Sequence, residues 1–162
     1  MCPLLISFSH SWSDKLVKNL IVKSPAFENN NHIPTKYTCD GDNVNPPLTI
    51  EGAPEETKSL VLILDDPDAA AGTWNHWLVW NIPPTCKIKE DAVPGIQGVN
   101  TAGKRDYGGP CPPSGTHRYF FKVYALDTEL NSNPNSQKED IEKAMQSHIL
   151  AQGELLGLYR RT

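Results

Sequence analysis

The sequence YGGPCPPSGTHRYFFKVYAL spans residues 107–126 and suggests an ordered loop leading into a β-strand. Its first part is rich in glycine and proline, and its last part is an apolar run that starts behind His117, Arg118 and Tyr119. Glycine permits unusual backbone conformations, whereas proline fixes φ and removes a donor. Such loops commonly hold polar side chains in a defined place. We therefore expect His117 and Tyr119 to belong to a functional loop at the end of a strand.

A second stretch has the same character. Asp65-Asp66-Pro67-Asp68 follows the apolar run Leu60–Leu64, and Trp74-Asn75-His76-Trp77 leads into the next apolar run. Both stretches place Asp, His or Tyr side chains beside an apolar strand. We expect the two loops to share one polar pocket.

Composition limits the function classes. The chain has 162 residues and a net charge of −4, which fits one domain with its own hydrophobic core. Lys104-Arg105 is a pair rather than a basic patch, so a general nucleic-acid or anionic-membrane surface is not expected. The apolar run Leu60–Leu64 is far too short to span a bilayer.

The chain ends and cysteines suggest a cytoplasmic protein. Residues 1–17 are predicted to be a loosely attached leader without the basic region of a secretory signal, and residues 18–162 a single domain. The four cysteines lack metal-binding spacing, and in the cytoplasm they are expected to be reduced. If any disulfide forms, Cys39 and Cys111 are the candidates, because both lie in turn-rich loops.

Short apolar segments separated by Pro, Gly, Asn and Asp indicate a mostly β domain. Their Val, Ile and aromatic content favours strands. The predicted strands are Leu20–Val22, Leu48–Ile50, Ser59–Leu64, His76–Ile82, Tyr119–Leu126 and Leu155–Tyr159.

One segment near the C-terminus changes to helical periodicity. Ser136-Gln137-Lys138-Glu139 has the spacing of a capping box, and apolar residues recur at helical spacing from Ile141 to Ile149. His148 is placed on this helix, and Gly153 is expected to end it. The sequence therefore predicts one C-terminal helix on a β-rich body.

Strand alternation assigns directions to the candidate side chains. His76 and Trp77 are expected on opposite faces, whereas His117 and Tyr119 share a face with Arg118 on the other. Asp66 could accept a hydrogen bond from a histidine and fix its tautomer. An Asx turn before a proline is the alternative explanation for this aspartate.

The combination of two imidazoles, a tyrosine hydroxyl and a glycine-rich loop suits an anion. Imidazole N–H and Tyr O–H groups donate, and backbone amides around Gly108-Gly109 and Gly115 could form an anion-binding nest. Trp74, Trp77 and the loop prolines would supply apolar walls. A ligand with one phosphate or carboxylate head fits this set.

Three alternatives stay open. A metal site could use His76, His117, Asp66 and Asp68, although no HxH or HxxxH pair is present. A hydrolase could pair Ser114 with His117, although Ser114 lacks the nucleophile-elbow context. Both motifs could also be purely structural. We predict no metal, cofactor or catalytic residue, and we take His10, His32 and His148 as structural or solvated.

The two motifs resemble the phosphatidylethanolamine-binding protein family, also called Raf-kinase-inhibitor-like proteins, and most closely its bacterial and archaeal branch. The resemblance extends over about residues 18–160. It is carried by Asp65–Ala69, Gly72–Trp77 with Asn81–Pro83, Tyr107–Tyr119 with Tyr124–Asp127, Ser24–Phe27, Ile33–Pro34, Tyr37–Gly41, and His148–Ala151 with Glu154, Leu155 and Gly157.

The resemblance implies an antiparallel β-sandwich with a C-terminal α-helix and a small cavity for phosphate, phosphorylethanolamine head groups or nucleotides. The matching pocket residues are Asp66, Trp74, His76, Pro113, His117 and Tyr119, with Asp68, Gly109 and Arg118 in support. Ala70 stands where eukaryotic members usually have proline, which could loosen one pocket wall. Asn75 replaces a second histidine and should point away from His76.

The leading hypothesis is a non-enzymatic binding module for a small anion. The alternatives are an inhibitor or regulator of a kinase or protease, acting through a pocket rim that includes Lys104 and Arg105, and weak hydrolysis with His76 or His117 as general base. Prokaryotic relatives often form homodimers, so the resemblance also implies a homodimer.

Overall fold

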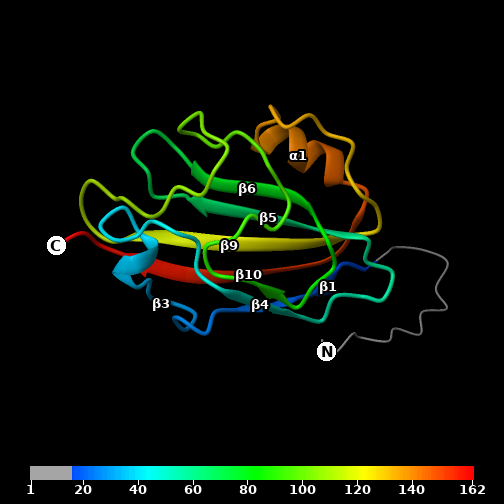
Figure 1. The fold of residues 1–162 in the computed structure, drawn as a ribbon, viewed down its shortest axis with the longest axis horizontal. Coiled ribbons are helices and arrows are strands. Elements are labelled where there is room, and N and C mark those ends of the chain that lie inside the picture. The colour runs from blue at the N-terminus through cyan, green and yellow to red at the C-terminus, as the bar shows by residue number, and fades with distance from the viewer. Residues whose placement is uncertain (1–15) are drawn as a thin grey trace.

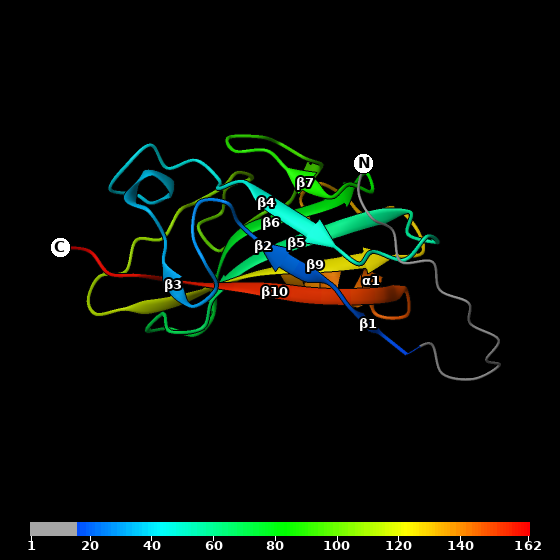
Figure 2. The same ribbon diagram turned by 90° about the horizontal axis from the view of Figure 1, so that it is seen from below.

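The computed structural model describes residues 16–162, which form two packed β-sheets with one helix on the outside (Figure 1). The predicted leader lies almost entirely outside the described residues. The larger sheet has the order β1-β10-β9-β5-β6-β8, with β3 also paired to β10, and the smaller sheet has the order β2-β4-β7. In Figure 2 the smaller sheet lies across one face of the larger sheet.

The bounds of the elements follow. The larger sheet contains β1 (Lys18–Asn19), β3 (Asn31–His32), β5 (Ser59–Asp66), β6 (Trp74–Ile82), β8 (Ile96–Gln97), β9 (His117–Leu126) and β10 (Ile149–Tyr159). The smaller sheet contains β2 (Ile21–Lys23), β4 (Leu48–Glu51) and β7 (Lys87–Ile88). A 3₁₀ helix, η1 (Thr35–Tyr37), and the helix α1 (Lys138–Met145) complete the fold.

The central strand β5 is buried along its whole length, because both of its faces are covered. Leu60, Leu62 and Leu64 face the smaller sheet and join the main core. Val61 and Ile63 point the other way, into a second core that α1 closes with Ile141 and Met145. This two-sided burial explains why the run Leu60–Leu64 shows no polar alternation.

The C-terminal part differs from the prediction. The helix α1 ends at Met145, and β10 already begins at Ile149, so Gly153 lies inside a strand. At Gly153 a side chain would collide with the backbone carbonyl of Leu20, so this glycine lets the backbone between β1 and β2 approach β10 closely rather than ending a helix. The prediction that the helix continues to Ile149 was wrong, because residues from Ile149 onward pair with β9 as a strand.

Two further details correct the expected architecture. The sheets are not purely antiparallel, since β1 and β3 each pair in parallel with β10. The helix cap also lies one residue later than predicted, because the Asp140 carboxylate accepts from the backbone N–H of Gln137 at 2.9 Å. The short strands β1, β3, β7 and β8 have only two residues each, too few to show a periodicity in the sequence.

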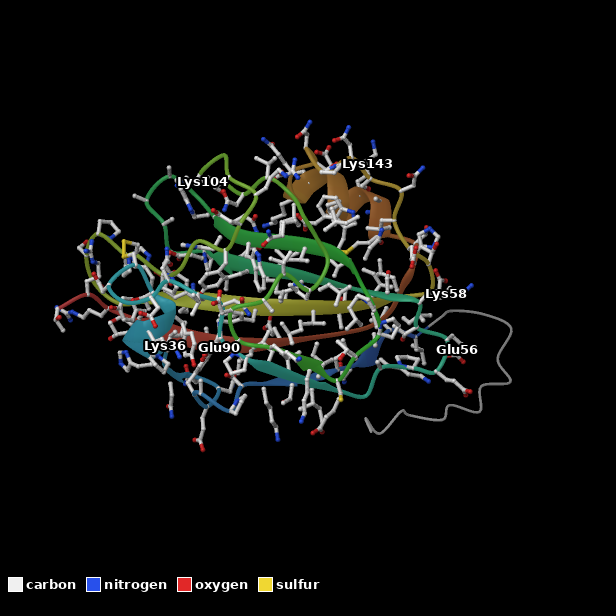
Figure 3. All side chains as sticks on the ribbon, viewed as in Figure 1. Lys36, Glu56, Lys58, Glu90, Lys104 and Lys143 are labelled. Carbon is white, nitrogen blue, oxygen red and sulfur yellow. A yellow bond between two sulfur atoms is a disulfide. The ribbon has the colours of Figure 1, made fainter. Side chains whose placement is uncertain are left out.

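The expectation of reduced thiols is wrong for all the described cysteines, since Cys39, Cys86 and Cys111 are each disulfide-bonded. Cys39 and Cys111 form a disulfide with Cα atoms 5.5 Å apart, although 72 positions separate them in the sequence. The yellow bond at the left of Figure 3 marks this disulfide. Sequence spacing carries no information about such a contact, because only the folded chain brings the two loops together.

Candidate functional site

The candidate site lies where β5 ends and β6 and β9 begin, at the end of the larger sheet shown at the left of Figures 1 and 2. Asp66 is the last residue of β5, and Trp74 is its register partner on β6. His117 and Tyr119 are buried on the β9 face that carries the main core, whereas Arg118 between them is exposed. The predicted alternation across β9 is confirmed.

A β-bulge places His76 in the site. Leu64 pairs with Trp77 and Asp65 pairs with Asn75, so His76 is an extra residue on β6. The bulge turns His76 toward Tyr119, with ring centroids 5.4 Å apart, while Trp77 joins the main core on the same side. The prediction that His76 and Trp77 face opposite ways is therefore wrong, because a bulge breaks the period of two. Bulges often redirect side chains beside functional sites.

The Gly108-Gly109 segment holds His76 rather than an anion. His76 Nδ1 lies 2.8 Å from the carbonyl oxygen of Gly108, and Gly108 N–H donates to the His76 carbonyl at 3.0 Å. Gly109 N–H donates to Asn43 Oδ1 at 2.8 Å. Both amides are thus occupied, and the predicted anion nest at these two glycines is wrong. A side chain at Gly109 would also collide with Tyr37 and Asn43.

Asp66 holds His117 in place. Its Oδ2 lies 2.7 Å from His117 Nδ1, and its Oδ1 accepts the backbone N–H of Asp68 at 2.7 Å. Asp66 and His117 are both buried, with 3% and 9% of their surface exposed. Both oxygens of the carboxylate therefore have a donor, and the imidazole is fixed in one orientation.

Asp68 and Arg118 brace this arrangement from outside. Arg118 donates to the Asp68 carboxylate through its backbone N–H at 2.9 Å, Nε at 3.0 Å and Nη2 at 2.9 Å. These hydrogen bonds hold the pKa of Asp68 below its usual value. The contact chain from Arg118 through Asp68 to Asp66 accords with the supporting role expected for Asp68 and Arg118.

The hydrogen bonds decide the histidine tautomers. A carbonyl oxygen and a carboxylate oxygen only accept, so both His76 and His117 carry a proton on Nδ1. Each neutral ring then offers an unprotonated Nε2, and each protonated ring offers an Nε2–H donor. Burial lowers the pKa of His76, which favours its neutral form near pH 7.

The ring of Tyr119 contacts both imidazoles. Its ring stacks near His117 at a centroid distance of 6.5 Å, and no part of the side chain is exposed. Within residues 16–162 its hydroxyl has no hydrogen-bond partner of acceptable geometry. Burial raises the pKa of Tyr119, and the nearby Asp66 carboxylate adds to the rise, so the hydroxyl stays a neutral donor.

The outer residues of the predicted set lie in the flanking segments. Trp74 has 38% of its surface exposed at the start of β6, and Pro113 is exposed in the loop before β9. Lys104 and Arg105 are exposed in the segment leading to Gly108. The structure thus brings Asp66, His76, His117 and Tyr119 into one cluster, with Trp74 and Pro113 on the segments around it.

The competing site types receive less geometric support. Across residues 16–162, no three His, Cys, Asp or Glu side chains gather in an arrangement that could hold a metal ion. Ser114 is exposed and makes no hydrogen bond to His117 in this part of the chain. No helix among the described residues is long and apolar enough to cross a membrane.

The other histidines lie away from the cluster or outside the described residues. His32 is exposed on β3. His148 lies in the turn after α1, not on the helix, and its Nδ1 is 2.8 Å from the Asp127 carboxylate. His10 belongs to the part of the chain that is not described.

The opposite face of the sheet carries a separate polar network. Asn75 points away from His76, as expected, and its Nδ2 donates to Asp65 Oδ1 at 3.1 Å. Asp65 also accepts from Lys138 at 2.7 Å and Lys122 at 3.3 Å. A cavity of about 310 Å³ lies beside Asn75 and Lys138. Neighbouring residues on β5 and β6 therefore point to opposite faces of the sheet: Asp66 and His76 to the candidate site, and Asp65 and Asn75 to this network.

The region that contains this cluster matches a known family. Residues 23–160 fit the family model described as phosphatidylethanolamine-binding protein. The chain belongs to this family. A UPF0098 protein of Methanothermobacter thermautotrophicus is 50% identical over 148 residues, which cover 86% of this chain and 98% of that protein. A UPF0098 protein of Chlamydia muridarum is 44% identical over 145 residues, covering 85% of this chain and 97% of the relative.

Solved structures agree with this membership. A crystal structure of a phosphatidylethanolamine-binding protein homologue from Chlamydia trachomatis is similar with a TM-score of 0.86 at 41% identity, covering 90% of this chain and 99% of that chain. The E. coli protein YbcL, described as a member of the mammalian family, is similar with a TM-score of 0.82 at 31% identity. That similarity covers 89% of this chain and 99% of YbcL. The expected β-sandwich with its C-terminal helix is confirmed.

Several residues that shape the site were not singled out as site residues from the sequence. Tyr107 donates its hydroxyl to the Tyr37 carbonyl at 2.7 Å, and Asn43 fixes Gly109. Tyr37 and Tyr107 both belong to segments that carry the family resemblance, which is the available signal for them. The direct contact of this segment with the Gly/Pro loop depends on the tertiary fold.

Proposed function

We propose that this member of the phosphatidylethanolamine-binding protein family is a non-enzymatic binding module for a phosphate-type head group. The observation that carries the proposal is that His76 and His117 both contact the ring of Tyr119, whose buried hydroxyl has no hydrogen-bond partner among the described residues. Both imidazoles have Nδ1 engaged elsewhere, so their Nε2 atoms remain for a ligand. Two imidazoles and one hydroxyl match the several oxygens of a phosphoryl group.

Protonation is part of the proposed recognition. A phosphate monoester has its second pKa near about 6, and an unperturbed histidine titrates near about 6.5. His76 is neutral near pH 7 because burial lowers its pKa. A bound phosphoryl group must therefore either carry a proton that it donates to Nε2 or induce proton uptake by the ring. Affinity should rise as the pH falls through about 6.5 and below.

Calorimetric titration with inorganic phosphate and O-phosphorylethanolamine tests the proposal. His76→Gln and His117→Gln should each weaken binding by about tenfold or more, because each removes one charge-assisted hydrogen bond. His148→Gln is the matched control, since His148 pairs with Asp127 in a separate turn. Undetectable binding to the wild type, or equal loss in the control, would contradict the proposal.

A protein partner is the second candidate, favoured by the exposure of Trp74. A large aromatic side chain with 38% of its surface accessible is the type of residue that anchors interfaces. Lys104 and Arg105 would add positive charge to a partner contact. A kinase or protease assay with Trp74→Ala and Lys104→Ala tests regulation: inhibition by the wild type that both variants retain would contradict a role for this rim.

Three further expectations remain predictions. Hydrolysis is less supported than binding, because the exposed Ser114 makes no hydrogen bond to His117 among the described residues. A homodimer can be tested by sedimentation equilibrium. The Cys39–Cys111 disulfide argues against a cytoplasmic location, because disulfides are rare in that compartment outside hyperthermophiles. Those that do form in the cytoplasm of other organisms are usually transient or redox-sensing.

A further inference from the structure

We propose that the Cys39–Cys111 disulfide is a redox modification site that regulates the phosphate pocket. The inference rests on the proposed function, because the regulated property is the affinity of that pocket. Two cysteines far apart in sequence are joined at the point where the Gly/Pro loop approaches Tyr119. The two joined segments differ in how many other contacts fix them in the fold.

The segment that carries Cys39 is held by other contacts. Thr38 is fully buried, and Cys39 N–H donates to the Pro110 carbonyl at 3.1 Å. Asp40 accepts from the Tyr159 hydroxyl at 2.7 Å and from Arg161 Nη2 at 3.0 Å, which ties the turn to β10 and the residues after it. This segment therefore stays in place when the S–S bond breaks.

The segment that follows Cys111 is held much less firmly. Within residues 16–162, the stretch 112–116 makes no hydrogen bond with itself or with other segments. Pro112 is buried, but residues 113–116 are exposed, and Gly115 has a left-handed φ of +70° with open space around it. The stretch is fixed at one end by β9 and at the other by Cys111 and the hydrogen bonds of Gly109 and Pro110.

The loosely held segment is also the one that forms the pocket. Pro113 belongs to the predicted pocket set, and His117 follows the segment directly. The Cys111 backbone lies close enough to the Tyr119 hydroxyl to oppose the rise in its pKa, without reaching hydrogen-bonding geometry. The disulfide therefore positions the backbone that covers Tyr119. Release of this backbone would remove a preformed wall of the pocket.

The chemistry needs only a dithiol, which supplies the electrons. Cys111 is exposed and Cys39 is only half-buried, so a thiolate of the dithiol attacks the more accessible Cys111 sulfur. The S–S bond breaks, and Cys39 leaves as a thiolate that takes up a proton. The second thiol of the reagent then attacks the mixed disulfide and releases Cys111 as a thiol. The protein gains two electrons and two protons, and the dithiol becomes a cyclic disulfide.

Reduction should weaken ligand binding. An oxidised protein presents the loop in its binding position, whereas a reduced protein must order residues 111–116 when the ligand binds. We expect about a tenfold rise in the dissociation constant for inorganic phosphate or O-phosphorylethanolamine. The loop amides of Ser114, Gly115 and Thr116 should also show lower backbone order parameters after reduction.

The experiment compares four samples by calorimetry and ¹⁵N relaxation. They are the wild type and Cys39→Ser/Cys111→Ser, each with and without dithiothreitol. Reduced wild type and both samples of the double variant should share the weaker affinity and the mobile loop. Insensitivity of the double variant to dithiothreitol assigns the effect to this pair. If the double variant does not fold, Cys86→Ser in its oxidised and reduced forms makes the comparison, because dithiothreitol would also reduce the disulfide that Cys86 forms in the wild type.

The outcomes separate the two proposals. If the oxidised protein binds the probe and reduction changes its affinity by less than twofold, the redox inference is overturned and the proposed function stands. Tighter binding after reduction also overturns the inference, because the sign contradicts a preformed wall. If neither redox state binds inorganic phosphate or O-phosphorylethanolamine, both proposals fail.

Discussion

The substitution Asp66→Asn isolates the role of the carboxylate that holds His117. In the wild type, Asp66 Oδ1 accepts from the backbone of Asp68 and Oδ2 faces His117 Nδ1 at 2.7 Å. Asparagine has the same shape, and its oxygen can keep the bond to Asp68. Its Nδ2 then faces His117, so two donors meet unless the ring moves its proton from Nδ1 to Nε2. The variant should therefore change the tautomer of His117 with little change in packing.

The expected loss of affinity follows from the bond that disappears. A hydrogen bond to a charged partner contributes about 1.5–3 kcal/mol. His117 loses this charged partner, and a buried Asn amide faces its ring instead. Since about 1.4 kcal/mol corresponds to tenfold in affinity, binding of a phosphate monoester should weaken by roughly 10- to 150-fold.

Two measurements check this expectation. Long-range ¹H–¹⁵N spectra of the imidazole identify the protonated nitrogen of His117 at pH 7.5, and calorimetry with O-phosphorylethanolamine gives the affinity. The neighbouring substitution Asp65→Asn is the matched control. Asp65 is equally buried on β5, but it faces Lys122 and Lys138 on the other side of the sheet. Asp65→Asn should lower stability and leave both the His117 tautomer and ligand affinity unchanged.

Two results would refute this reasoning. One is an unchanged His117 spectrum in a folded Asp66→Asn variant, which would mean that the carboxylate does not decide the tautomer. The other is an equal loss of affinity in Asp65→Asn and Asp66→Asn. In that case the loss would reflect the end of β5 as a whole rather than the contact between Asp66 and His117.

Further perturbations address stability and the remaining site residues. Folding lowers the pKa of His76, so its contribution to the free energy of unfolding is present above about pH 6.5 and is lost as the pH falls. Urea titrations from pH 7.5 to 5 should show this decrease in the free energy of unfolding. An equal decrease in His76→Gln would count against the assignment to His76. The pair Cys39→Ser/Cys111→Ser should lower the unfolding free energy by about 4 kcal/mol, because the disulfide closes a loop of 72 positions; a loss below about 1 kcal/mol in urea would contradict the chain-entropy argument. Tyr119→Phe removes a buried hydroxyl without a partner among the described residues, so stability should stay equal or rise while phosphate affinity falls; a large drop in melting temperature would reveal a hidden partner. Gly115→Ala should cost about 1 kcal/mol through its left-handed φ alone, and thermal unfolding measures this cost.

Local patterns were informative where one segment decides its own structure. The β-rich class followed from short apolar runs between turn residues, and alternation placed His117 and Tyr119 together with Arg118 outside. The long motif at residues 107–119 carried the family resemblance, and it lies within residues 23–160, which fit the family model. The whole predicted set from Asp66 to Tyr119 could thus be named before any contact was known.

Local patterns failed where a second segment decides the outcome. The segment from Ile149 has helical spacing in the sequence, but it pairs with β9 as a strand. The backbone amides of Gly108 and Gly109, expected to bind an anion, donate to His76 and Asn43 instead. No spacing in the sequence indicates these partners. Asn43 comes from the loop containing residues 36–43, which reaches the site only through tertiary packing.

The chain alone determined which chemistry is available: two imidazoles, a carboxylate and a tyrosine beside a stiff Gly/Pro loop. Two features of the site depend on the tertiary structure. A single extra residue in β6 turned His76 toward Tyr119, and the meeting of two distant loops joined Cys39 to Cys111. Both depend on register and contact between segments far apart in the chain. Residue types and local periodicity cannot encode such relations, because each segment's own pattern is the same whichever partner it meets.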